Sequence, residues 1–256
     1  MKTLAAVALA MAIASCEGAS ERPAEVLPDL DQVVPRGLAI LVEGDEERLI
    51  FISAVENVGR GPLVIAGRRA ETLEPNMSAR QLVRLAGGGT AEYPLHMRLE
   101  FVVSETHQHW HLLGFERYEL RTPAGEPMGR DRKTGFCLGD RYDARSKVRI
   151  PGEPPRAVWT HNCAKNQPER LRVLQGISPG YGDDYVPNLE GQFVDVTDVP
   201  AGRYLLVHRV NSEDDLHESN YENNAASVLF ELTRPEGEPP QVRVLAECPA
   251  SANCGT

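Results

Sequence analysis

Short apolar stretches recur along the chain at intervals typical of β-strands. Each is rich in Val, Ile, Leu and aromatic residues, and Gly, Pro and Asn punctuate the segments between them, as in NVGRGP and AGGGT. No stretch sustains a helical period with capping signals, so a parallel βαβ architecture is disfavoured. The pattern therefore predicts an all-β fold, an antiparallel β-sandwich with long functional loops. The expected strands are 37–43, 48–55, 62–66, 96–104, 170–174, 192–196, 203–210 and 226–232.

One long segment departs from this pattern. Between Thr122 and Pro168 the strand signal fades into a stretch with Gly, Pro and charge, which contains Lys133, Cys137 and Cys163. Loops of this length are usually functional, disordered or held by a covalent tie. We expect part of the functional site here.

The first residues have the layout of an export signal. An early lysine precedes an apolar run from Leu4 to Ala14, which is too short to span a membrane, and small residues lead to Cys16. The sequence IASC resembles the bacterial lipobox, in which the cysteine becomes a lipid-modified N-terminus. An ordinary cleaved signal peptide is the alternative. We expect an exported protein of the bacterial envelope, in the periplasm or at the cell surface, that meets the membrane through a lipid on Cys16 only.

Length and composition favour one domain. The 256 residues are 41% hydrophobic, enough for one sizeable core. Residues 1–15 are expected to be a signal peptide and 16–28 a lipidated N-terminus with a flexible Pro/Ala/Glu-rich tether. The domain is expected over 29–246, followed by a C-terminal tail, 247–256, with a possible small disulfide loop.

Four cysteines remain when Cys16 is set aside. They are an even number in a chain that reaches an oxidising compartment, which indicates two disulfides, and none lies in a CxxC motif. Three pairings are possible. Loop length favours Cys137 with Cys163 and Cys248 with Cys254.

The net charge of -10 argues against nucleic acid as a partner, because phosphate binding needs a basic surface. A cationic substrate suits this charge better.

Three of the seven histidines lie within five residues of one strand-like segment, ETHQHWHLLGFERYEL. Side chains at alternate positions of a strand project from one face, so His107, His109 and His111 are expected to be neighbours. In a regular strand the outer two lie roughly 13 Å apart, too far for a shared ion at bond lengths of about 2 Å. A bulge must bring them closer, and Gly114 is a candidate position for it.

A cluster of imidazoles is a common way to hold Zn, Cu or Ni, and the affinity order favours copper. The alternative is three surface histidines on the polar face of an edge strand, or a mixture in which one of them is buried and hydrogen-bonded. The other four histidines are scattered singly and are expected to be ordinary structural or exposed residues; they are His96, His161, His208 and His217.

Four segments, in order, resemble motifs of the lysyl oxidase family over roughly residues 29–233. HQHWHLLGFERYEL is similar to the copper-binding stretch, and RKTGFCLGD to the segment of the cofactor lysine. GISPGYGDDYVPNLEGQFVDVTDVPAGRYLL is similar to the segment of the cofactor tyrosine, and ESNYENN to the Asn-rich lead-in near the C-terminus. The segments are 107–120, 132–140, 176–206 and 218–224.

The resemblance implies a copper-dependent amine oxidase that converts primary amines, either lysyl side chains or small di- and polyamines, to aldehydes. O2 is the oxidant, and NH3 and H2O2 are released. The implied copper ligands are the three histidines, and the implied cofactor is a lysine tyrosylquinone formed from Lys133 and Tyr185. Asp183 and its neighbour Asp184 are the nearest candidate bases in the sequence.

Two positions depart from the animal members of the family, which carry cysteines where this chain has Thr106 and Tyr181. Tyr181 also offers a competing tyrosine for oxidation. A second class of function therefore stays open: a copper-binding or adhesive β-sandwich module without amine oxidation.

Overall fold

The computed structural model describes residues 23–104, 108–144, 149–187, 189 and 191–254, with backbone only for Asp131 and Lys133. Within these ranges the chain forms sixteen β-strands and no helix, and every strand pair is antiparallel. The all-β prediction is confirmed. The described part of the chain accordingly offers no helix of sufficient length and apolarity for a membrane crossing.

The larger sheet has the order β11-β5-β6-β7-β8-β14-β15-β16, with β1 added to β6 and β9 added to β8. Its strands are β1 (Glu25–Val26), β5 (Leu63–Arg68), β6 (Asn76–Leu85), β7 (Thr90–Val103), β8 (Gln108–Arg121), β9 (Pro127–Phe136), β11 (Arg172–Ile177), β14 (Gly202–Val210), β15 (Ala225–Thr233) and β16 (Gln241–Cys248).

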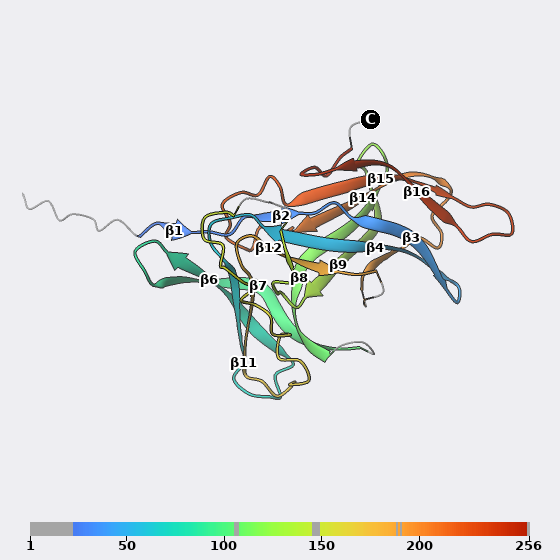
Figure 1. The fold of residues 1–256 in the computed structure, drawn as a ribbon. Coiled ribbons are helices and arrows are strands. Elements are labelled where there is room, and N and C mark those ends of the chain that lie inside the picture. The colour runs from blue at the N-terminus through green and yellow to red at the C-terminus, as the bar shows by residue number, and fades with distance from the viewer. Residues whose placement is uncertain (1–22, 105–107, 145–148, 188, 190, 255–256) are drawn as a thin grey trace, which may run out of the picture.

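The smaller sheet is built around one long strand. It has the order β10-β12-β4-β13, and β2 and β3 also pair with β4. Its strands are β2 (Leu30–Gln32), β3 (Arg36–Glu43), β4 (Glu46–Asn57), β10 (Tyr142–Asp143), β12 (Tyr181–Tyr185) and β13 (Phe193–Asp195). In Figure 1 the blue strands β3 and β4 lie across the green and orange strands of the larger sheet, as expected for a sandwich.

Strand β8 changes partners halfway along its length. Residues 108–113 pair with β7, and residues 116–121 pair with β14. Gly114 lies between the two halves with φ +81, a backbone angle that favours glycine, and the register against β9 shifts between Leu113 and Glu116. The predicted irregularity at Gly114 is confirmed.

Two apolar clusters fill the space between the sheets. The first surrounds Trp110, Phe115 and Phe136 and includes Tyr185, and the second surrounds Phe51 and Phe230. Each fully buried large side chain stabilises the fold by about 1.5–3 kcal/mol. The candidate site therefore borders the first cluster.

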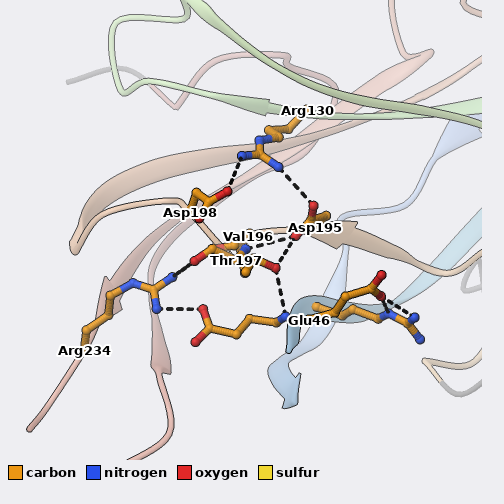
Figure 2. Close-up of polar contacts among 9 residues, drawn as sticks. Glu46, Arg130, Asp195, Val196, Thr197, Asp198 and Arg234 are labelled. Carbon is orange, nitrogen blue, oxygen red and sulfur yellow. Dashed lines mark hydrogen bonds and ion pairs between the residues drawn. The ribbon is translucent and has the colours of Figure 1, made fainter. Parts of the chain in front are cut away.

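The motif VDVTDV (194–199) covers the end of β13 and the turn that leads to β14, and this turn is held by hydrogen bonds. Asp195 accepts bonds from the backbone N–H and hydroxyl of Thr197, and Arg130 of β9 donates to the Asp195 carboxylate at 3.0 Å. Arg234 donates to the backbone oxygen of Val196 at 2.8 Å. Figure 2 shows Arg130, within β9, and Arg234, directly after β15, on two sides of this turn. This motif thus joins elements of the two sheets.

Both disulfides follow the pairing that loop length favoured. Cys137 is bonded to Cys163, and Cys248 is bonded to Cys254, closing a small loop directly after β16.

Several expectations need correction. The segment 122–168, expected to be a long loop, contains the ten-residue strand β9 and the short β10. The strands β1, β2, β6, β12 and β16 were also not predicted. The tether expected over 16–28 is ordered at its end: Ala86 donates to the Ala24 oxygen, Gly61 donates to the Leu27 oxygen, and β1 pairs with β6. Backbone pairing, which a Pro/Ala/Glu-rich composition does not predict, fixes these residues on the domain.

Candidate active site

Two histidines of the triplet lie side by side on the first half of β8. The ring centroids of His109 and His111 are 4.7 Å apart; His111 is buried and His109 is half-buried. Between them Trp110 is buried in the apolar cluster, and its backbone N–H donates to the oxygen of Cys163. His107 lies outside the described residues. The structure thus brings two of the three predicted ligands together.

Tyr185 closes β12 beside these imidazoles. Its ring centroid is 6.4 Å from that of His111 and 3.9 Å from that of Phe136. Its hydroxyl accepts a hydrogen bond from the backbone N–H of Cys137 at 2.7 Å. Burial raises the pKa of Tyr185 well above its ordinary value, and the nearby Asp183 raises it further. The phenol is therefore held neutral in a largely dry environment.

Lys133 reaches this region through the backbone of β9. The strand ends at Phe136, three residues after Lys133, and the next residue, Cys137, donates the hydrogen bond to Tyr185. At about 3.4 Å per residue, Lys133 is about 10 Å along the strand from the ring contact. The two segments expected to supply the cofactor are thus adjacent, although the Lys133 side chain is outside the described part.

A cavity of about 220 Å³ opens onto Tyr185. Its described lining is His109, Arg141, Asn162, Lys165, Asp184, Tyr185 and Leu189. Four of these, Arg141, Asn162, Lys165 and Leu189, were missed by the sequence analysis, because residues in a loop carry no signal of where the loop folds. We name this cavity the Tyr185 cavity.

The two candidate bases occupy different environments. The side chain of Asp183 is fully buried, accepts a hydrogen bond from the Gly139 N–H at 3.1 Å, and has its pKa raised by burial, an effect opposed by Arg141. Asp184 is half-buried and lines the Tyr185 cavity. Only Asp184 of the two therefore contacts the space that a ligand can enter.

Tyr181, the competing tyrosine, faces a different cavity. It lies four residues before Tyr185 on β12 and lines a space with Val58, Asp143 and Arg149, none of which borders the Tyr185 cavity. The structure separates the two tyrosines.

The donor set fits a transition-metal ion. Two imidazoles on one strand with ring centroids 4.7 Å apart can share an ion at bonds of about 2 Å, and a nitrogen-rich set suits copper(II) or zinc. Among the described residues alone, no three His, Cys, Asp or Glu side chains form a metal-binding group. The third predicted ligand, His107, is outside that set.

One of the scattered histidines is buried in a polar network between the two apolar clusters. His208 contacts the carboxylate of Glu116, the hydroxyl of Ser53 at 3.1 Å and the amide of Gln32 at 2.9 Å. Ser53 is also the cross-strand partner of Tyr185 in the smaller sheet. This network supports the strand that carries Tyr185.

The ESNYENN motif is also structural. Glu218 is buried and accepts hydrogen bonds from the side chains of Asn211 and Asn224 and from the backbone N–H of Leu30. It therefore joins the loop before β15 to β2.

Taken together, the described residues define an antiparallel β-sandwich domain with paired imidazoles and a buried tyrosine at a cavity. The family model described as lysyl oxidase matches residues 65–236, and the chain belongs to the lysyl oxidase family.

The chain is similar to several curated members of this family. It is 26% identical to lysyl oxidase homolog 2 of Rattus norvegicus over 207 residues, 78% of this chain and 23% of that protein. It is 29% identical to human lysyl oxidase homolog 1 over 153 residues, 59% of this chain and 24% of that protein. With human lysyl oxidase homolog 3 it shares 29% identity over 143 residues, 54% of this chain and 16% of that protein. The chain thus spans about a quarter or less of the length of these relatives.

Proposed function

We propose that this protein is a copper-dependent amine oxidase that converts primary amines to aldehydes with O2 and water, releasing NH3 and H2O2. One observation carries the proposal: the His109–His111 pair and the end of the Lys133 strand both lie against the buried Tyr185 ring, and Tyr185 and His109 line one cavity. Membership of the lysyl oxidase family supports the same reaction class.

In this proposal His107, His109 and His111 hold the copper ion, and Lys133 and Tyr185 form a lysine tyrosylquinone. The quinone supplies an electron sink for oxidation of the amine, and O2 is the final electron acceptor.

The remaining residues keep the site dry, fixed and able to accept a proton. Phe136 and the first apolar cluster exclude water from the Tyr185 ring, while the Cys137 N–H fixes its oxygen. Asp184, at the cavity wall, takes the proton from the carbon next to the amine. We place this role on Asp184 rather than on the buried Asp183.

The location we propose is the bacterial envelope, with the domain held by a lipid on Cys16. The two disulfides support an oxidising compartment.

The test is a peptide map of copper-loaded protein. We expect the peptides of Lys133 and Tyr185 to run as one crosslinked species that reacts with carbonyl reagents, and the protein to release peroxide from primary amines. Tyr185→Phe removes the crosslink and the carbonyl reactivity. Tyr181→Phe, the matched control on the same strand, keeps both. Two separate, unmodified peptides in protein that retains copper would instead identify a copper-binding or adhesive module.

A further inference from the structure

A loop takes the place of a neighbouring strand beside the histidines. The first half of β8 pairs with β7 along one edge, and in the described structure β9 pairs with only the last two residues of this half. Along the rest of this second edge, the N–H of Trp110 donates to the oxygen of Cys163 at 3.1 Å. The N–H of Asn166 donates to the oxygen of Gln108 at 2.8 Å. We call residues 163–171, which fix the histidine strand on this side, the clamped loop.

The side chain of Arg69 holds the clamped loop. Arg69 directly follows β5 and is buried. Its guanidinium donates to the backbone oxygen of Arg170 at 2.9 Å and to that of Pro168, both in this loop. It also donates to the backbone oxygens of Thr72 at 3.1 Å and Glu74 at 2.6 Å, in the loop after β5. A buried cation is stable only when acceptors satisfy it, and the planar guanidinium with its five donors can bond two segments at once.

Arg69 also contacts the indole between the two described histidines. The central carbon of its guanidinium lies 4.8 Å from the centre of the Trp110 ring, a cation–π contact. The indole N–H of Trp110 donates to the backbone oxygen of Gln167 at 3.2 Å, in the clamped loop. Successive side chains of a strand project from opposite faces, so a fixed Trp110 fixes the directions in which His109 and His111 project from the other face.

We propose that Arg69 is a positioning residue of the metal site, which holds the Trp110 ring and the clamped loop so that the two imidazoles are aligned before the ion binds. Arg69 is absent from the described lining of the Tyr185 cavity, so it acts through these neighbours. Metal sites need their ligands held to within about 0.5 Å, and groups that orient the ligands contribute about 10–100-fold to metal affinity. The inference rests on the proposed copper site.

The clamped loop carries the same effect to the wall of the Tyr185 cavity. Lys165 belongs to this loop and lines the cavity together with His109. It lies between Cys163 and Asn166, which are both bonded to β8. Loss of the guanidinium should therefore loosen the histidine half of β8 and this wall, while the second half of β8 keeps its pairing with β9 and β14.

The experiment measures binding of copper(II) to the copper-free full chain, in the original protein and in Arg69→Met, Arg69→Lys and Arg234→Met. Arg234 is the matched control, because its guanidinium also donates to backbone oxygens, those of Val196, Thr197 and Val199, in the turn after β13 (Figure 2). Competition with a chelator gives the copper affinity, and the electron paramagnetic resonance (EPR) spectrum of bound copper(II) reports its coordination. Urea unfolding of the copper-free chain gives the stability of each variant.

Arg69→Met should bind copper(II) about tenfold more weakly than the original protein, with a changed EPR spectrum. Arg69→Lys keeps the charge but not the planar fork of donors, so its affinity should fall between the two. Arg234→Met should lose stability and keep both the copper affinity and the spectrum. Trp110→Phe keeps an aromatic ring but loses the hydrogen bond to Gln167, and it should weaken copper binding severalfold, so it tests the same path if Arg69→Met does not fold.

Unchanged copper affinity and EPR spectrum in folded Arg69→Met overturn the inference. An equal loss of affinity in Arg234→Met also overturns it, because copper binding would then follow the stability of the whole domain. If Arg69→Met does not fold, unchanged affinity in Arg69→Lys and Trp110→Phe has the same meaning.

Failure of this inference is distinct from failure of the proposed function. A protein that carries the Lys133–Tyr185 crosslink, and whose copper site is indifferent to Arg69, fails here only. One whose copper affinity and spectrum depend on Arg69, but which forms no crosslink, fails only as an oxidase.

Discussion

The hydroxyl of Tyr185 accepts its hydrogen bond from the backbone of Cys137, a residue tied to Cys163 by a disulfide. The oxygen atom of the candidate cofactor is thus positioned by main chain whose own position depends on a covalent link. Cys163 in turn accepts a hydrogen bond from the N–H of Trp110, between the two described histidines. One disulfide therefore connects the tyrosine to the histidine strand.

Removing this disulfide should destabilise the domain more than removing the other. The closed segments span 26 and 6 residues, so loop entropy alone gives about 3–4 kcal/mol for Cys137→Ser/Cys163→Ser and about 2 kcal/mol for Cys248→Ser/Cys254→Ser. Denaturant unfolding measures both. The first variant should also lose the yield of crosslinked cofactor, and the second should keep it. Equal loss of cofactor in both would contradict the link from Cys137 to Tyr185.

Copper retention should depend on His109. Its imidazole is the central one of the triplet and lies next to His111, so His109→Ala is expected to lower the copper that survives desalting about tenfold or more. His96→Ala is the matched control, because that ring is fully exposed, is hydrogen-bonded to Asp215 and does not line the Tyr185 cavity. Metal content by mass spectrometry decides the matter. Unchanged retention in His109→Ala would mean that the triplet is not the metal site.

The free energy of unfolding of the domain should fall as the pH rises through the range in which Asp31, a residue of β2, loses its proton. Burial, together with the carboxylates of Glu56 and Asp29, raises the pKa of Asp31 to about 6 from 3.8. Glu56 is its direct cross-strand partner. The folded state therefore holds a proton that the unfolded chain has released, and the free energy of unfolding decreases between about pH 4 and pH 6.

Asp31→Asn removes this dependence. When discounted for the partial exposure of Asp31, its pKa shift corresponds to about 1–2 kcal/mol. The free energy of unfolding of the variant should rise by this amount at pH 7 and stay unchanged at pH 3.5. Asp45→Asn is the control, in the exposed turn between β3 and β4. It should leave the difference in the free energy of unfolding between pH 7 and pH 3.5 as it is in the original protein. Thermal unfolding at the two pH values measures the effect. An equal gain in stability for Asp31→Asn at both pH values would mean that the gain does not come from the proton on Asp31.

The buried pair His208 and Glu116 should show non-additive energetics. His208→Val leaves the Glu116 carboxyl without one of its contacts in the core and should lower the free energy of unfolding by about 3 kcal/mol. The double variant His208→Val/Glu116→Leu replaces both polar groups and should recover at least about half of that loss. Urea unfolding of the original protein, the two single variants His208→Val and Glu116→Leu, and the double variant gives the interaction energy of the pair by a double-mutant cycle. Simple addition of the two single effects would show that the groups do not interact.

Much of the fold was predictable where large apolar residues carry the strand pattern. The expected strand 203–210 matches β14 (Gly202–Val210) closely, and Gly114 marked the irregularity in β8. The strand β9 was missed because PMGRDRKTGF has Gly, Pro and charge, and its strand conformation comes from pairing with β8. In β6 the buried face is carried by Met77, Ala79, Gln81 and Val83, two of which are small or polar.

The candidate site was predictable only in part. The histidines and the Tyr185 segment were found from spacing and resemblance. The Tyr185 cavity was not, because the loop residues Arg141 and Lys165 reach it through tertiary folding. The placement of Asp183 had a usable signal. Asp183 lies two residues before Tyr185 on the same strand, so both side chains project from one face, and in β12 the side chains of this face are buried. The environment of His208 had none, since Glu116 lies 92 residues away.

At Gly114 the partner of β8 changes from β7 to β14 on one edge, while β9 pairs with residues on both sides of this glycine. The residues before this glycine display the imidazoles, and the residues after it are anchored between β9 and β14. Substitutions before Gly114 can therefore change the side chains displayed beside Tyr185 while the pairing of residues 116–121 with β14 is kept. In a strand divided in this way, the residues that decide which ligand binds are separate from the residues that hold the strand in the sheet.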